Sequence, residues 1–160
     1  MVRKLKFQGT LYGGILLLFA ADRIFKNFFI KNPAIKRVFL FLSFSLTKND
    51  GIAFGMPVDK FMLNILVVIF ILGLMMLFLN IMNISRYVHI EKIGKEYLRI
   101  IIFLILIAAI NNFVDRILYG AVIDYIELPH FVSLNIADIM ITAGFLAISF
   151  IYLFEKVEKR

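Results

Sequence analysis

The 160-residue chain contains no cysteine, only two histidines and only three prolines. Without cysteine it can form no disulfide, use no thiol nucleophile, ligate no iron–sulfur cluster and carry no lipid on a thiol of its own. His89 and His130 lie in different connections and make no metal-ligand pattern, so we expect no metal and no cofactor. Hydrolytic chemistry would then depend on carboxyl groups that can act as acid and base.

Apolar residues, in contrast, make up 62% of the chain, and its mean hydropathy is +0.92. This composition excludes an ordinary soluble domain, because the surplus apolar surface has to face lipid. We therefore expect a mainly α membrane protein with a single domain over residues 1–160. Four stretches are long enough to cross a bilayer: approximately Phe7–Phe28, Phe61–Ile84, Leu98–Leu118 and Val132–Phe154. Because Asp22 and Lys26 follow the apolar run of the first stretch, we interpret it as a retained helix and not as a cleaved signal peptide.

The net charge of +7 fits the membrane interpretation. Basic residues cluster before the first span, between spans two and three, and after span four, which puts both termini in the cytoplasm by the positive-inside rule. The connection 120–131 has no Lys or Arg, as an outer connection should. The first outer connection departs from the rule, since it contains Lys31, Lys36, Arg37, Lys48 and Lys60. No nucleic-acid motif is present, so we expect no nucleic-acid partner.

The two outer connections contain all three prolines, which favours non-helical structure there. Residues 37–47 partly alternate apolar and small polar side chains and predict a strand, and Asn49-Asp50-Gly51 predicts a turn after it. We expect a small outer β-element lying on the membrane and a short outer loop or helix. Asp124 is expected in such a loop, where a carboxylate taken alone would more often be solvated.

Polar residues fall at one depth of three spans. Fifteen or sixteen residues, or roughly 22–24 Å of helix, separate the inner ends of these spans from their first outer polar groups. Asp22 and Lys26 are spaced i,i+4, so a salt bridge between them is the simplest interpretation. Span three supplies a polar face of Asn112, Asp115 and Arg116, and span four supplies Asn135 and Asp138. A shared polar layer is better support for a site than a single charge.

Asp138 is the hardest of these residues to explain as structural. Ionisable groups at membrane depth are costly, and no basic residue lies within a helical turn of Asp138. Its partner must come from elsewhere in the fold, and Arg116 and Asp124 are the candidates. If Asp124 and Asp138 converge, they are sufficient for acid–base hydrolysis without a metal.

Five short motifs give the chain a family resemblance. Together they resemble, in order and spacing, those of the lipoprotein signal peptidases (signal peptidase II): Asp22–Lys26, Asn49–Phe54, Asn112–Arg116, Val122–Ile126 and Asn135–Asp138. The resemblance spans the whole chain. Two positions depart from the pattern: residues 108–111 (Ala-Ala-Ile-Asn) replace a glycine-rich turn, and Leu134 replaces a phenylalanine.

The resemblance implies an aspartic endopeptidase in the bacterial cytoplasmic (inner) membrane, with its active site toward the outer face. It would cut diacylglyceryl-modified prolipoproteins just before the lipidated cysteine, and a globomycin-type inhibitor would bind it. Membrane lipids and the substrate are the expected partners, and a monomer is the expected state. The implied roles are catalysis for Asp124 and Asp138; dyad support or substrate binding for Asn112, Arg116, Asn135, Asn49 and Gly51; and a structural polar layer for Asp22, Lys26 and Asp115.

Other classes of membrane protein remain open at this point. The main alternative is a small proton-coupled transporter or channel subunit, because membrane carboxylates also form proton relays. A relay should distribute polar groups through the membrane, whereas the inner two-thirds of spans one, three and four are nearly bare. A non-enzymatic scaffold would not need Asp138. A presenilin-type protease is disfavoured because its Gly-x-Gly-Asp motif is absent.

Overall fold

The computed structural model describes residues 2–39, 42–51, 59–84, 92–128 and 132–158. These residues form long helices and short strands. The helices are α1 (Val2–Lys31), α2 (Lys60–Ile84), α3 (Lys92–Tyr119) and α4 (Ile136–Glu158). The strands are β1 (Arg37–Phe39), β2 (Leu42–Asn49), β3 (Val122–Leu128) and β4 (Val132–Leu134).

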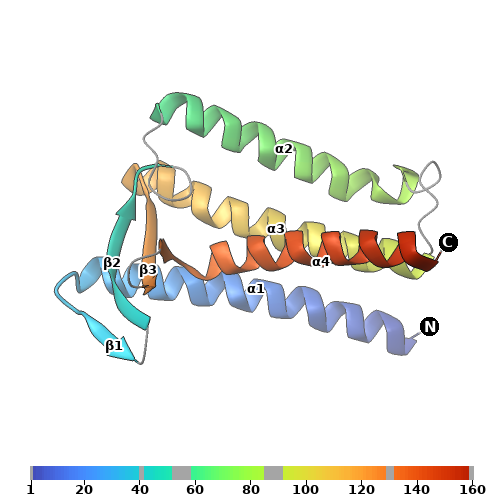
Figure 1. The fold of residues 1–160 in the computed structure, drawn as a ribbon, viewed down its shortest axis with the longest axis horizontal. Helices are drawn as coiled ribbons and strands as arrows, with labels where there is room; N and C mark the ends of the chain where they lie inside the picture. Colours follow the sequence, from blue (N-terminus) through green and yellow to red (C-terminus); the bar gives the residue numbers. More distant parts are fainter. Residues whose placement is uncertain (1, 40–41, 52–58, 85–91, 129–131, 159–160) are drawn as a thin grey trace.

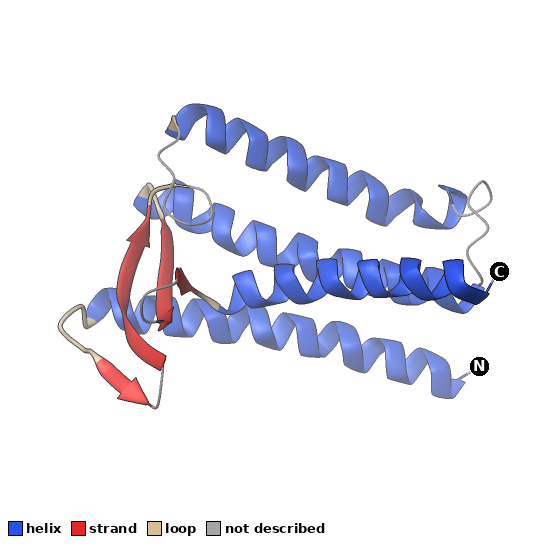
Figure 2. Ribbon diagram, in the orientation of Figure 1, coloured by secondary structure: helices blue, strands red, loops and turns tan. Residues whose placement is uncertain are grey.

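The helices run side by side as a bundle, and the strands gather at one end of it (Figures 1 and 2). The beginning of α1 and the end of α4 lie together at the opposite end of the bundle (Figure 1). The segments that contain the strands therefore all lie at the same end of the bundle.

Three of the helices are long and apolar enough to cross a membrane, over Lys60–Ile81, Lys95–Tyr119 and Ile136–Leu153. Only 6% of the first of these windows is buried inside the protein, so nearly all of α2 needs a hydrocarbon environment. The helix α1 is 30 residues long, but its charged residues Asp22, Arg23 and Lys26 interrupt its apolar character. By length and apolar composition alone, α1 is therefore not counted with the three helices that could cross a membrane.

The centre of the bundle is built on α3, which packs against each of the other helices. A core cluster joins Ile15 of α1 to Ala108 of α3 and to Ala137 and Met140 of α4. Ala108 is fully buried, so a small side chain lies at this crossing. Small residues allow membrane helices to approach closely.

The strands form one antiparallel sheet in the order β1-β2-β3-β4. The segment 37–47, expected to be strand, does contain strand, but it is divided between two paired strands, β1 and β2. The expected start of the fourth span at Val132 was wrong. Residues Val132–Leu134 are strand β4, and α4 begins only at Ile136.

Asp124 was expected to lie in a loop, and this was wrong. It lies in strand β3. It pairs in register with Thr47 of β2, and Val122 of the same strand pairs with Asn49. Successive side chains of a strand point to opposite faces of the sheet, so the pairing of β3 fixes the face on which the Asp124 side chain lies. Its exposure is 0%, which rules out a solvated carboxylate.

Candidate active site

The start of α4 fixes the carboxyl group of Asp138. Asn135 precedes the helix, and its Oδ1 accepts a hydrogen bond of 2.9 Å from the backbone N–H of Asp138. In return, the backbone N–H of Asn135 donates to Asp138 Oδ2 at 3.2 Å. These reciprocal bonds form a capping box with Asn and Asp in its two positions. The same motif that begins the helix therefore also orients a carboxylate.

Asn135 connects this carboxylate to the second one. Its Nδ2 donates to Asp124 Oδ1 at 2.7 Å, and it also reaches the backbone carbonyl of Ile123 at 3.3 Å. Asn135 is fully buried. One asparagine thus binds both carboxyl groups, which brings together the two residues predicted to form the dyad.

The surroundings of Asp124 favour its protonated form. Its Oδ2 accepts a long hydrogen bond of 3.3 Å from Asn49 Nδ2. Burial, and after it the nearby charge of Asp138, raise the pKa of Asp124 from 3.8 to about 7. Hydrogen bonds from Asn135 and Asn49, and the charge of Lys26, act in the opposite direction. Near neutral pH this carboxyl group can both hold and release a proton.

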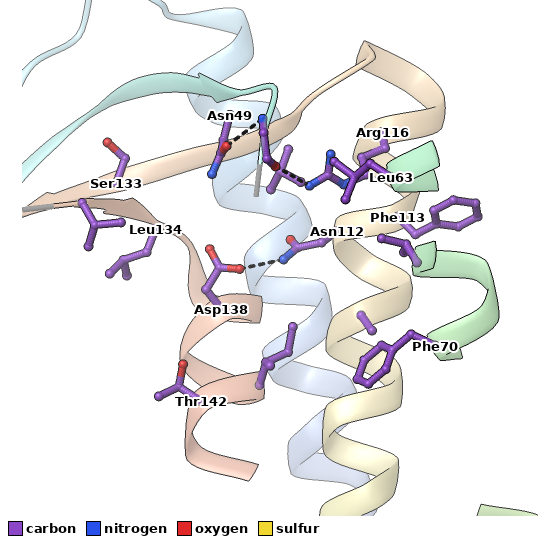
Figure 3. A pocket seen from close by; sticks show the side chains of 16 residues that line it. Asn49, Leu63, Phe70, Asn112, Phe113, Arg116, Ser133, Leu134, Asp138 and Thr142 are labelled. Atoms are coloured by element: carbon purple, nitrogen blue, oxygen red, sulfur yellow. Dashed lines mark hydrogen bonds between the residues drawn. The ribbon is translucent and has the colours of Figure 1, made fainter. Parts of the chain in front are cut away.

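Asp138 receives its second hydrogen bond from α3. Asn112 Nδ2 donates to Asp138 Oδ1 at 2.8 Å, and the two side chains point toward each other in Figure 3. The expectation that Arg116 or Asp124 would be the partner of Asp138 was wrong in detail, because amide groups bind it. Arg116 Nη2 instead donates to the backbone carbonyl of Gly51 at 3.0 Å.

The turn predicted at residues 49–51 lies at the edge of this site. The backbone N–H of Gly51 donates to Asn49 Oδ1 at 3.2 Å, which fixes the amide of Asn49. Arg116 then holds Gly51 from α3 (Figure 3). Asn49 is therefore held beside Asp124, and Gly51 lies next to it in the same turn.

A buried ionic cluster lies beneath the two carboxyl groups. The i,i+4 ion pair predicted between Lys26 and Asp22 is present, with Nζ 2.9 Å from Oδ2. Lys26 Nζ also lies 2.7 Å from Asp115 Oδ2, and Arg23 forms an ion pair with Asp115 Oδ1. Asp22, Asp115 and Lys26 are no more than 1% exposed. Two carboxylates and two cations balance, as burial of charge requires.

Asp115 and Arg116 meet different partners, because neighbouring side chains on a helix point about 100° apart. Asp115 Oδ2 also accepts a hydrogen bond of 3.2 Å from the backbone N–H of Ile123 in β3. The cluster therefore ties α1 and α3 to the strand that carries Asp124.

Two members of this network were missed from the sequence. Asn111 Nδ2 donates to Asp22 Oδ2 at 2.8 Å, and Tyr125 Oη donates to Asp22 Oδ1 at 2.7 Å. Asp22 Oδ1 also accepts the backbone N–H of Ile136, the first residue of α4, at 3.0 Å. A polar Asn111 in an apolar helix was a usable signal, whereas the role of Tyr125 depends on contacts far apart in sequence.

Tyr125 is held by aromatic rings of α1. Phe25 and Phe29 each stack on it with ring centroids 5.6 Å apart. Burial raises the pKa of Tyr125 above its ordinary value, and the adjacent Asp22 carboxylate acts in the same direction. The phenol therefore stays protonated and keeps donating to Asp22.

A cavity of about 440 Å³ opens beside the carboxyl groups, between α2, α3, α4 and the sheet. Its polar lining includes Asn112, Arg116 and Asp138 together with Asn49 and Gly51 (Figure 3). The rest is mainly apolar. Its members from the three helices are Leu63, Val67, Phe70, Ala109, Phe113 and Ile141, and the sheet adds Val122, Val132 and Leu134. One side of the cavity suits a peptide and the other suits hydrocarbon.

Asp138 lines this cavity, while Asp124 lies behind Asn135 and Asn49 and is not among the described residues that line it. Within the described part of the chain, no group of three or more His, Cys, Asp or Glu side chains is placed to hold a metal ion. The arrangement offers two carboxyl groups that share one asparagine.

Comparisons with known proteins agree with this geometry. Residues 14–154 match the family model described as Signal peptidase (SPase) II. A lipoprotein signal peptidase of Clostridium tetani is 34% identical over 141 residues, which cover 81% of this chain and 83% of the relative. One of Pelagibacter ubique is 33% identical over 156 residues, covering 88% and 85%.

Solved structures share the fold. A bacterial membrane enzyme solved by the in meso method at 2.3 Å resolution aligns with a TM-score of 0.77 over 95% of this chain and 92% of its own, at 23% identity. A second bacterial membrane enzyme, at 1.9 Å resolution, aligns with a TM-score of 0.69 over 91% and 93%, at 24% identity. With the family match covering most of the sequence, the chain belongs to the signal peptidase II family.

Proposed function

We propose that this protein is a membrane aspartic endopeptidase that removes the signal peptide of diacylglyceryl-modified prolipoproteins, cutting just before the lipidated cysteine. The observation that carries the proposal is the pair of hydrogen bonds by which Asn135 binds both Asp124 and Asp138. Membership of the family supports the same reaction. The alternative of a proton-coupled transporter is not favoured, because the relatives are named as peptidases.

The chemistry needs one ionised and one protonated carboxyl group. Two carboxylates that bind the same asparagine in a poorly hydrated site should hold one proton between them and titrate as a unit. The ionised member takes a proton from water as the water oxygen bonds to the scissile carbonyl carbon. The protonated member donates to the carbonyl oxygen and then, as the C–N bond breaks, a proton passes to the leaving amine. The raised pKa of Asp124 suits a group that carries a proton near neutral pH.

The cavity suggests how the substrate lies. Its apolar side, between α2 and α4, would accept the acyl chains from the membrane, and its polar side, at Asn49, Arg116 and Asp138, would bind the peptide. Asn49 also covers Asp124, so we expect its amide to move aside when peptide and water enter. A globomycin-type inhibitor would occupy the same cavity.

The orientation follows from the same proposal. We infer that α1 is a fourth span, because it lies along the bundle with the other helices (Figure 1). Its charged residues Asp22, Arg23 and Lys26 meet partners inside the protein, and burial of this kind allows charge at membrane depth. With both termini in the cytoplasm of a bacterial inner membrane, the sheet and the dyad would face outward. The chain would work as a monomer.

A cleavage assay with dyad variants tests the function. The purified protein in non-ionic detergent is offered a diacylglyceryl-modified prolipoprotein, and Asp124→Asn and Asp138→Asn are compared with the wild type. Each substitution should reduce cleavage to background, because an amide can neither accept nor donate the catalytic proton. Glu127→Gln is a matched control on the same strand as Asp124, and it should leave cleavage unchanged. Full activity in either Asp variant would refute the dyad, and proton flux in liposomes without cleavage would support the transporter.

A further inference from the structure

Lys26 makes one contact that charge balance does not require. Its ammonium group has three N–H bonds, and each has an acceptor: Asp22 Oδ2 at 2.9 Å, Asp115 Oδ2 at 2.7 Å and Asn112 Oδ1 at 2.8 Å. The two carboxylates account for its burial at 1% exposure. The third acceptor is a neutral amide on α3. That contact therefore needs another explanation.

The contact decides which way the amide of Asn112 faces. Lysine has only donors, so the carbonyl oxygen of Asn112 has to face it. The amide nitrogen is then turned to the opposite side, where it donates to Asp138 Oδ1 at 2.8 Å. A reversed amide would place N–H groups against the ammonium and an oxygen against the carboxylate. Both contacts would be repulsive.

We propose that Lys26 is a positioning residue that acts through Asn112: it holds Asp138 as the ionised partner that takes the proton from water and leaves the shared proton on Asp124. This inference rests on the peptidase function proposed above. Lys26 itself touches neither water nor peptide in this scheme. It acts by presenting a donor, and not an acceptor, to Asp138.

The hydrogen bonds of the two carboxyl groups support this division. Both oxygens of Asp138 accept an N–H, one from Asn112 and one from Asn135, which suits a group that only accepts. Asp124 is bound firmly at Oδ1, at 2.7 Å, but its Oδ2 has only the 3.3 Å contact with Asn49. The proton has room at this second oxygen.

The charges around Asp124 give the inference a pH signature. Asp138 faces it from α4, Lys26 from α1 and Arg116 from α3, while Asn135 and Asn49 donate hydrogen bonds to it. Asp138 raises the pKa of Asp124 and Lys26 lowers it. Removing Lys26 should therefore raise that pKa further. The loss of activity at alkaline pH should move to higher pH.

A double-mutant cycle between Lys26→Met and Asn112→Ala tests the link. Lys26→Met should lower kcat about ten- to hundredfold with KM little changed, the size expected for losing a hydrogen bond to a charged group. In the Asn112→Ala background the same substitution should change kcat less than about twofold, because the link is already broken. Equal losses of kcat in both backgrounds would overturn the inference.

Arg23→Met is the matched control. Arg23 pairs with the same Asp115 as Lys26, so its loss removes one cation from the same cluster without a contact to Asn112. It should lower the unfolding temperature but keep kcat and the alkaline limb of the pH profile. If Arg23→Met reproduces both effects of Lys26→Met, the role of Lys26 is structural.

Folding of the variants is checked separately. If Lys26→Met does not fold, the charge-balanced pair Lys26→Met/Asp22→Asn is compared with Asp22→Asn alone. A carbon-13 NMR titration of the aspartate carboxyl groups is done on the wild-type chain, so it does not depend on the folding of any variant. It should find Asp138 ionised and Asp124 protonated at pH 6, and the reverse would overturn the inference. A wild-type chain that cleaves no lipidated substrate would instead refute the proposed function.

Discussion

The alkaline side of the pH profile is where the geometry around Asp124 can be measured. Burial and the charge of Asp138 raise the pKa of Asp124 from 3.8 to about 7. This difference corresponds to about 4 kcal/mol in favour of the protonated form. Because the pKa is raised, the carboxyl group keeps its proton up to near-neutral pH and loses it above. The proposed mechanism needs that proton, so activity should fall as pH rises.

The size of the fall follows from the same value. With an apparent pKa of about 7 for the dyad, kcat/KM should drop about tenfold for each pH unit above it, and at pH 9 it should be about one hundredth of its value at pH 6. The apparent value belongs to the coupled pair. At acid pH, protonation of the second carboxyl group should also reduce activity. A bell-shaped profile is therefore expected.

The assay is cleavage of a lipidated prolipoprotein in a non-ionic detergent that does not titrate between pH 5 and 9. Aliquots returned to pH 6 after each exposure should recover full activity, which separates titration from unfolding. A constant kcat/KM between pH 6 and 9 would refute the idea that the reaction needs a carboxyl proton with a pKa of about 7. A loss of activity already complete by pH 6 would show that Asp124 ionises like an ordinary aspartate.

Two further substitutions test the packing that supports the site. Gly144→Ala should destabilise the protein by about 1–3 kcal/mol, because a Cβ at Gly144 would overlap the side chain of Ile105 on α3. Gly73→Ala on α2 is its control, since its Cβ would meet open space, and thermal unfolding in detergent should show a loss only for Gly144. Tyr125→Phe should cost about 1.5–3 kcal/mol by the same measurement, because it removes a hydrogen bond to the Asp22 carboxylate but keeps the ring stack. An unfolding temperature unchanged by Tyr125→Phe would show that Asp22 does not need this donor.

Much of the fold could be predicted from the sequence because its signals are local. An apolar run long enough to cross a bilayer predicts a helix wherever it occurs, and the positions of α2 and α3 agree closely with the predicted spans. The pairing of Asp22 with Lys26 follows from helical spacing alone. The motifs also led to Asp124, Asp138 and the residues around them. Their catalytic roles remain predictions.

The predictions failed where pairing between distant segments decides the structure. Asp124 looks like a loop residue in isolation, but pairing of β3 with β2 makes it part of a buried sheet. The fourth span was predicted to begin at Val132, but α4 begins at Ile136, because β4 pairs with β3 and Asn135 caps the helix. Residues 132–134 are apolar enough for either state. Only their partners distinguish a strand from a helix.

The sequence by itself determined that this protein needs a membrane and where most of its helices run, and it predicted which polar residues share a depth. The tertiary structure decided that one asparagine binds both carboxyl groups, and that Lys26 reaches Asn112, a residue 86 positions away. The physical reason is that apolar burial and helical spacing act over a few residues, whereas an ammonium or a carboxylate inside a membrane finds its partners wherever the bundle packs them.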